Sequence, residues 1–463
     1  MENMKRLTLL LGIIFIVCSA SNVNAQLQRR AFLGTQLKEV DTFIAVKHNM
    51  KHAKGVLVEM VVDGSSAKAM GIEANDLILA VEDVEVNSPN ELIARIGRYR
   101  AGDKVRVTTM RNGKPIQRVG NLLPLPHETS PFGEVIYDEV PHDGGYIRTI
   151  IHKPVGKGQF PALFLIPGYD CSSIDRMHPD NVYKRILDGM VEKGYVIVKT
   201  EKAGVGDSKN NRSCAQYNLF DEVDLFSASF NALAKYDFID LENVYIFGHS
   251  MGGVQAPLMK TDFAPRGIAV YGTVVRPWFE YFIEHARMQK IILSQVDDMG
   301  WDYLSIEQQH NAAVKFYYRF LVEKQSPAEI FKDEELNAFI SKNFRYDGSD
   351  IFLGRHYTFW QQLQDTKLFE AWSKSPAHVL SLWGEADFIA FNPWEHELIA
   401  DVVNEYNPGK AKYIRVPNMD HSFLWVEDQK QSITSRMDWD YIKNNFNSQI
   451  IEILAEWIEE TKN

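Results

Sequence analysis

One six-residue stretch constrains the fold of this chain more than any other: residues 248–253 have the sequence Gly-His-Ser-Met-Gly-Gly. They follow the apolar run 244–247, which is typical of a buried strand. In a Gly-x-Ser-x-Gly pattern the chain turns so tightly from strand to helix that side chains at Gly248 and Gly252 would clash. We therefore expect Ser250 to stand at this turn with its hydroxyl exposed. The alternative is an ordinary tight turn, in which small residues cluster without a function.

A serine nucleophile needs a base to take its proton and a carboxylate to orient that base. Two later apolar runs, 379–383 and 413–416, predict further buried strands. Asp387 follows the first of these strands and His421 follows the second. Either residue alone is most simply a solvated loop side chain. Three candidates in the order Ser, Asp, His, each just after a predicted strand, favour a catalytic triad.

With these motifs, residues from about 132 to 460 resemble an α/β-hydrolase. Ser250, Asp387 and His421 match the catalytic triad of that family. The resemblance implies an α/β fold with an α/β-hydrolase sheet, and the acyl-enzyme chemistry of a serine hydrolase. A fold of this kind hosts many activities, so the resemblance does not identify the substrate.

The resemblance also implies an oxyanion hole. Acyl transfer builds negative charge on the carbonyl oxygen, and fixed N–H donors aimed at that oxygen lower the barrier. In this chain the donors would be the backbone N–H groups of Met251 and of Tyr169, which lies in the loop after a predicted strand over 162–166. The usual His-Gly of the family is Pro-Gly here. The alternative for this loop is an ordinary strand-to-helix turn.

An insertion over about 276–375 separates the strand after Ser250 from the strand before Asp387. It has helical patterns and many large aromatic residues. We expect a helical cap that covers the active site, excludes water and sets specificity. Most of its aromatic side chains are expected in the core of the cap, and some should line an apolar substrate pocket.

The N-terminus has the features of a secretory signal. Lys5 and Arg6 precede an apolar run over 7–18, and residues 23–25 read Val-Asn-Ala. We expect a signal peptide over 1–25, and hence a periplasmic or secreted protein. No later stretch is long enough to span a membrane, so no integral membrane segment is expected after cleavage.

The net charge of the chain and the spacing of its possible metal ligands disfavour several kinds of binding partner. Fifty Lys and Arg residues face 61 Asp and Glu residues, for a formal net charge of −11. This balance disfavours nucleic acid and anionic membrane surfaces. Around Cys171 and Cys214 no pair of His or Cys residues has the spacing of a zinc site. We expect neither a metal nor a cofactor.

Residues from about 27 to 122 predict a small β-rich domain. Strand, turn, short helix, turn and strand follow one another over 55–81. Ser88 is a good N-cap for a helix that carries Ile93 and Ile96 on one face.

This segment resembles a PDZ domain of the kind attached to bacterial envelope enzymes. The resemblance implies that the loop with Phe32, Leu33 and Gly34 holds the C-terminal carboxylate of a peptide. The peptide would add a strand beside the helix that begins at Ser88. A domain that only packs against the hydrolase and binds no free peptide is an equal alternative.

Only two cysteines follow the predicted signal peptide, Cys171 and Cys214. Both lie in loops after neighbouring predicted strands, at the catalytic end of the sheet. In an oxidising compartment we expect them to form a disulfide. Two separate buried thiols are the alternative.

Three functions remain open at this point. The first is an envelope carboxylesterase for small or medium acyl esters. The second is a peptidase of the same fold, in which the PDZ domain presents a peptide terminus. Glu385 is the candidate to bind the peptide amine in that case, and a solvated surface carboxylate is the simpler interpretation of this residue. The third is a peptide-binding scaffold with an idle hydrolase domain, against which the complete triad argues.

Overall fold

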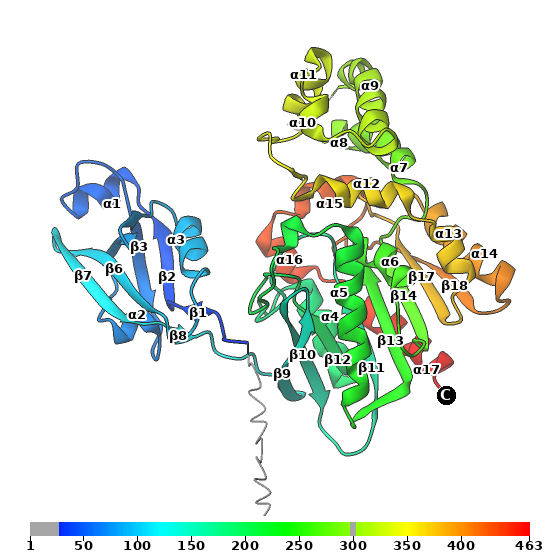
Figure 1. Ribbon diagram of the computed structural model, residues 1–463, viewed down its shortest axis with the longest axis horizontal. Helices are drawn as coiled ribbons and strands as arrows, with labels where there is room; N and C mark the ends of the chain where they lie inside the picture. The colour runs from blue at the N-terminus through cyan, green and yellow to red at the C-terminus, as the bar shows by residue number, and fades with distance from the viewer. Residues whose placement is uncertain (1–26, 297–301) are drawn as a thin grey trace, which may run out of the picture.

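The computed structural model describes residues 27–296 and 302–463, so the predicted signal peptide over 1–25 lies outside the described residues. A small β-rich unit comes first and a larger α/β unit follows it, with a layer of helices above the sheet of the larger unit (Figure 1). None of the helices within the described ranges is both long and apolar enough to cross a membrane.

The N-terminal unit is built on an antiparallel sheet with strand order β2-β3-β4-β6-β7, to which β5 adds by pairing with β4. Its strands are β2 (Thr35–Glu39), β3 (Val56–Val61), β4 (Leu77–Val81), β5 (Val84–Glu85), β6 (Lys104–Arg111) and β7 (Lys114–Asn121). Its helices are α1 (Thr42–Lys47), α2 (Ser66–Ala69) and α3 (Pro89–Ile96). Because β2 stands at the edge of the sheet, its outer side is open to a further strand.

Helix α3 begins where the sequence predicts but turns a different face inward. The Ser88 hydroxyl accepts the N–H of Glu91 at 3.2 Å, as an N-cap does. Leu92 and Ile96 are buried, whereas Ile93 is 61% exposed, so the face that packs on the sheet is centred on Leu92 and Ile96. Residues four apart lie on one face of a helix, and Ile93 lies one residue further around it than Leu92.

The larger unit is built on an eight-stranded sheet with the order β18-β17-β14-β13-β11-β12-β10-β9. Strands β9 and β10 form an antiparallel hairpin at one edge of the sheet, and the other six strands run parallel to one another. The strands are β9 (Gly133–His142), β10 (Gly145–Pro154), β11 (Phe160–Ile166), β12 (Val196–Thr200), β13 (Ile239–His249), β14 (Gly267–Tyr271), β17 (His378–Gly384) and β18 (Ala411–Val416). This topology, with a sharp strand-to-helix turn after the central strand β13, is the α/β-hydrolase fold.

Helices cover both faces of this sheet (Figure 1). Along β13, Tyr245 and Phe247 face a core completed by α4 and α17, while Val244 and Ile246 face a core that includes α5 and α14. This alternation is why the strand is apolar at every position from Val244 to Phe247. The helices around the sheet are α4 (Val182–Glu192), α5 (Leu219–Asn231), α6 (Met251–Gln255), α14 (Trp394–Tyr406), α15 (Gln429–Ser435), α16 (Trp439–Asn444) and α17 (Gln449–Thr461).

The insertion after β14 forms a helical cap over the end of the sheet where the parallel strands finish (Figure 1). Its buried aromatic residues, among them Phe316, Phe320 and Phe352, belong to the same apolar cluster as the core beneath it. The elements of the cap are α7 (Trp278–Glu284), α8 (Lys290–Ser294), α9 (Tyr303–Tyr317), α10 (Pro327–Ile330), α11 (Glu334–Asn343), β15 (Ile351–Phe352), β16 (Arg355–His356) and α12 (Tyr357–Asp365). The last helix of the insertion, α13 (Leu368–Ser373), packs against α14 at the side of the sheet.

The two units are joined by a pair of strands and a buried arginine. Strand β1 (Ala31–Phe32) enters the N-terminal unit beside β8 (Leu123–Pro124), which leaves it. Just before β1, the Arg29 guanidinium donates to Asp175 at 2.6 Å and to Asp207 at 2.5 Å. Arg29 is 8% exposed, so these two carboxylates and its bonds to backbone carbonyls replace the water it loses.

We expect Arg29→Met to destabilise the α/β unit by about 3 kcal/mol, because it leaves two buried carboxylates with one cation fewer. Urea unfolding followed by tryptophan fluorescence measures this effect, since all nine tryptophans lie after residue 277. Lys38→Met is the control, because Lys38 forms an exposed ion pair with Glu59, and its change should stay within about 0.5 kcal/mol. Equal stability of the two variants would contradict the role of Arg29.

Candidate active site

Ser250 lies at a strained turn between β13 and α6. Its backbone has φ 56° and ψ −118°, a combination that residues with a side chain rarely adopt. The flanking glycines leave no room for a side chain. A Cβ on Gly248 would lie 2.6 Å from the carbonyl oxygen of Gly252, and one on Gly252 would lie 2.0 Å from that of Ile166. The sequence pattern therefore corresponds to a close packing of three backbone segments around Ser250.

Asp387 and His421 meet at the ends of neighbouring strands. His421 Nδ1 lies 2.8 Å from Asp387 Oδ2, and the other carboxylate oxygen accepts the N–H groups of Ile389 and Ala390 at 2.8 and 2.9 Å. Burial would raise the pKa of Asp387, but His421 and these N–H groups outweigh it and hold that pKa below its ordinary value. Burial would also lower the pKa of His421, but the Asp387 carboxylate outweighs it and holds that pKa above its ordinary value.

Gly272, which the sequence analysis did not single out, makes this pairing fit. It follows β14 with φ +62°, and a Cβ there would lie 2.9 Å from His421 Nδ1 and 3.1 Å from Asp387 Oδ2. A larger residue would push the imidazole and the carboxylate apart.

A second histidine links the parts of the site. His249 Nε2 lies 3.0 Å from the carbonyl oxygen of His421, and His249 Nδ1 lies 2.5 Å from the hydroxyl of Tyr183. Burial lowers the pKa of His249 to about 3, so the ring is neutral at physiological pH. A neutral ring that donates from Nε2 to a carbonyl accepts at Nδ1. Tyr183 in turn accepts the N–H of Gly168 at 3.2 Å, so the chain of bonds runs from the loop after β11 to the loop that carries His421.

The predicted oxyanion donors lie beside Ser250. Met251 is the first residue of α6, where a backbone N–H has no partner within the helix. Gly168 is so near that a Cβ on it would lie 3.7 Å from the Cβ of Ser250. Tyr169, Ser250, Met251 and His421 all line one cavity.

This cavity has a volume of about 380 Å³ and is mostly apolar. None of its described lining residues is Asp, Glu, Lys or Arg. Glu385, suggested above as an amine-binding residue, instead forms an ion pair with Arg415 and does not line the cavity. The cap contributes the aromatic side chains Trp278, Tyr281, Phe282, Tyr317, Phe344 and Trp360.

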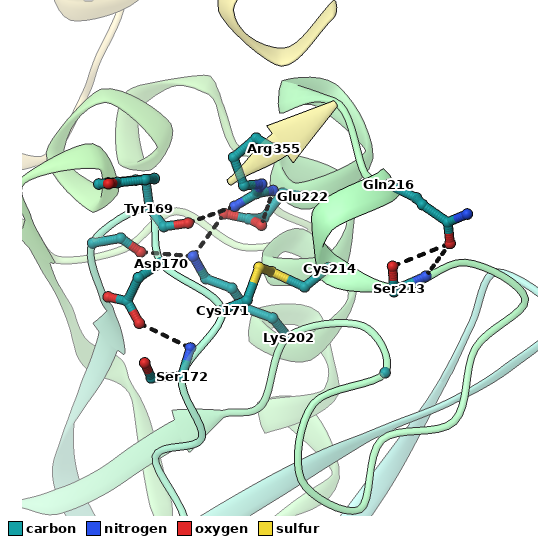
Figure 2. The surroundings of a disulfide bond; sticks show 12 residues. Tyr169, Asp170, Cys171, Ser172, Lys202, Ser213, Cys214, Gln216, Glu222 and Arg355 are labelled. Carbon is teal, nitrogen blue, oxygen red and sulfur yellow. Dashed lines mark hydrogen bonds and ion pairs between the residues drawn. A yellow bond between two sulfur atoms is a disulfide. The ribbon is translucent and has the colours of Figure 1, made fainter. Parts of the chain in front are cut away.

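The expected disulfide between Cys171 and Cys214 is confirmed, with the two Cα atoms 5.9 Å apart. It joins the loop after β11 to a 3₁₀ turn over Cys214–Gln216 (Figure 2). Cys171 lies two residues after Tyr169, so the bond restrains the loop that carries the predicted oxyanion donor.

The loop predicted to hold a peptide carboxylate lies next to the edge strand β2. Gly34 has φ +76°, and a Cβ there would lie 2.2 Å from the Cβ of Ser65. The carbonyl of Leu33 accepts the N–H of Ala67 at 2.9 Å, and that of Phe32 accepts the Ser66 hydroxyl at 2.5 Å. These bonds fix both carbonyls against α2.

Comparisons with known proteins match the N-terminal unit to a known family. The family model of the PDZ domain matches residues 31–118. The periplasmic pH-dependent serine endoprotease DegQ of Escherichia coli is 34% identical over 89 residues, which are 19% of this chain and 20% of DegQ. The chain therefore spans about a fifth of the length of that relative.

Among solved structures, the chain is similar to Est1E from Butyrivibrio proteoclasticus with bound ferulic acid. The TM-score is 0.43 at 15% identity, over 70% of this chain and 98% of that one. An esterase from Thermogutta terrifontis has a TM-score of 0.40 at 13% identity, over 72% of this chain and 100% of that one. The chain thus carries a PDZ domain, and its own strand order gives the α/β-hydrolase fold.

We expect Cys214→Ser to lower the stability of the α/β unit. The disulfide closes a loop of 43 residues, which in the chain-entropy model is worth about 4 kcal/mol. Thermal denaturation with and without dithiothreitol measures this contribution. The reductant should lower the Tm of the wild-type protein toward that of the variant and leave the variant unchanged. A wild-type Tm that does not respond to complete reduction would contradict the expectation.

Proposed function

We propose that this protein is a serine hydrolase that cleaves carboxylic esters through an acyl-enzyme intermediate. The observation that carries the proposal is the shared cavity, which Ser250 and His421 line together. His421 Nδ1 is hydrogen-bonded to the buried carboxylate of Asp387. A nucleophile, a base and an orienting carboxylate are the set that acyl transfer requires.

In the proposed mechanism His421 takes the proton of Ser250 as its oxygen attacks the ester carbonyl. The negative charge that forms on the carbonyl oxygen is stabilised by the N–H groups of Met251 and Tyr169. His421 then protonates the leaving alcohol, and water, activated by the same histidine, releases the acid. Asp387 holds the imidazole in position and stabilises its cation.

The cavity favours esters over peptides. A peptidase that recognises a free amine needs a buried carboxylate near the nucleophile, and the described lining of the cavity has none. An uncharged acyl group and an uncharged alcohol suit its aromatic walls. DegQ is named as an endoprotease, but the match to it spans only a fifth of its length, so it does not carry a peptidase activity to this chain.

We further propose that the protein works in the cell envelope and that its PDZ domain binds the C-terminus of a peptide along β2. The secretory pattern at the N-terminus and the disulfide both suit an oxidising compartment. The open edge of β2 suits an added strand.

Ser250→Ala tests the activity. With residues 26–463 and p-nitrophenyl esters of graded chain length, we expect ester turnover in the wild-type protein and its loss in the variant. Ser341→Ala, at an exposed position of the cap, should keep full turnover. Turnover of aminoacyl or prolyl amides equal to that of esters would favour the peptidase instead. If the protein turns over neither substrate and a fluorophosphonate does not label Ser250, the remaining hypothesis is a peptide-binding scaffold with an idle hydrolase domain.

The pH profile tests the roles of His421 and Asp387. Only neutral His421 can act as the base, so kcat/KM should fall toward acid pH with a midpoint above the ordinary pKa of histidine. Asp387→Asn removes the charge that raises the pKa of His421. The variant should lose about four orders of magnitude in kcat, and the midpoint of its remaining activity should move to lower pH.

Asp401→Asn, on the exposed side of α14, is the matched control and should change neither quantity. If the midpoint of the fall in kcat/KM toward acid pH does not move in Asp387→Asn, the proposed pairing of Asp387 with His421 is excluded.

A further inference from the structure

Two consecutive carbonyls of the loop after β11 are each held by a buried cation. Lys202 Nζ donates to the carbonyl oxygen of Gly168 at 2.6 Å, and Arg355 Nη1 donates to that of Tyr169 at 2.7 Å. Lys202 comes from the loop after β12, whereas Arg355 comes from β16 of the cap. Figure 2 shows both side chains beside the loop that carries Tyr169 and Cys171.

Glu222 of α5 holds the two cations together. Its carboxylate lies 3.0 Å from Lys202 Nζ and 2.5 Å from Arg355 Nη2, and it also accepts from Gln255 at 2.9 Å. Burial would raise the pKa of Glu222, but the two cations outweigh it and hold that pKa below its ordinary value. The carboxylate is therefore ionised in the folded protein.

Stability alone does not explain this cluster. The side chains of Lys202, Glu222 and Arg355 are at most 3% exposed, and removing each charge from water costs several kcal/mol. Apolar residues of the same volume often stabilise a protein as well as such a buried cluster does, or better. The cluster donates hydrogen bonds to the carbonyls of Gly168 and Tyr169, which apolar side chains could not do.

These hydrogen bonds set the direction of an N–H group. A peptide bond is planar and trans, so the carbonyl of Gly168 and the N–H of Tyr169 point in opposite directions. Lys202 on the carbonyl side therefore turns the Tyr169 N–H toward the opposite side and polarises it. Arg355 binds the carbonyl of the next peptide plane and so holds Tyr169 from its C-terminal side. Gly168 has no Cβ that would otherwise restrict the rotation of this peptide plane. Gly168 also lies beside Ser250, so the plane adjoins the reacting atoms.

We propose that Lys202, Glu222 and Arg355 are positioning residues that hold the Tyr169 N–H in the oxyanion hole, so that the cap completes the catalytic site through Arg355. This inference rests on the proposed serine hydrolase function. Arg355 is fixed within the cap because its guanidinium lies 4.2 Å over the ring of Phe359 in α12. The disulfide at Cys171 restrains the same loop from its other side.

Lys202→Met tests the inference in the full mature protein. Loss of a well-placed oxyanion donor lowers kcat by about 100-fold or more, and we expect a fall of this size with KM within about threefold of the wild-type value. Glu222 keeps Arg355 and Gln255 as partners in this variant. Lys324→Met is the matched control, because Lys324 also donates to a backbone carbonyl, that of Gln361, far from the loop in sequence. It should keep its kcat.

Three further measurements separate positioning from a merely structural role. The affinity for a trifluoromethyl ketone, which forms an oxyanion on Ser250, should weaken in Lys202→Met by about the factor lost in kcat. The affinity for the product acid should not change. Lys202→Gln retains a donor without the charge and should recover part of the lost kcat. Arg355→Met should also lower kcat. Its control is Arg319→Met, which removes an ion pair between Arg319 and Asp333 in the cap.

The outcomes distinguish this inference from the proposed function. Wild-type ester turnover with undiminished kcat in folded Lys202→Met and Arg355→Met would overturn the inference alone. A rise in KM at constant kcat, or a loss of Tm without a loss of kcat, would do the same. If the wild-type protein turns over no ester but is labelled at Ser250 by a fluorophosphonate, a slower labelling rate in Lys202→Met supports the positioning role. A wild-type protein that is neither active nor labelled overturns both.

Discussion

The close approach of three backbone segments at Ser250 is the constraint on which the catalytic end of this protein depends. Gly252 packs against the carbonyl of Ile166 at the end of β11, and no side chain fits between them. The approach places the loop after β11 next to the serine, and it holds Ser250 in a backbone conformation that costs about 1–3 kcal/mol. The surrounding sheet must supply that energy, and β13 is buried on both faces by two apolar clusters.

Around this turn the site is held by polar groups that come from distant parts of the chain. One set runs through Tyr183 and His249 to the backbone of His421. The other runs through Glu222 to the backbone of Gly168 and Tyr169. In both sets a buried side chain bonds to a backbone carbonyl or N–H and not to a substrate. The apolar cores stabilise the fold, whereas these sets fix the directions in which a few backbone groups point.

Sequence patterns predicted the parts of this structure that depend on neighbours along the chain. The strands before Ser250, Asp387 and His421 were predicted because each is a short run composed mostly of apolar residues. The disulfide was predicted because only two cysteines follow the predicted signal peptide and both come after neighbouring strands. The α/β-hydrolase fold and the PDZ domain were likewise predicted, each through its resemblance to a known family.

What the sequence could not predict depends on contacts between residues far apart in the chain. Glu222 lies in the first turn of α5, where the sequence alone indicates only the local role of a carboxylate at a helix N-terminus. In the structure it pairs with Lys202 before it and with Arg355, which is 133 residues later. Glu385 lies two residues before Asp387 in sequence, but it pairs with Arg415 on the adjacent strand and does not line the cavity. Ile93 shows the limit even within one helix, because periodicity alone does not say which of two adjacent residues faces inward.

The paired strands β1 and β8 have a mechanical consequence. A domain on a single flexible strand can swivel, whereas one whose entry and exit strands are bonded to each other resists twisting about the connection. Arg29, locked between Asp175 and Asp207 at the base of this ribbon, anchors it to the hydrolase unit. A peptide bound along β2 would therefore keep a fixed orientation relative to the sheet of the α/β unit. A force applied to that peptide would be transmitted to the α/β unit through the β1–β8 pair and the ion pairs of Arg29.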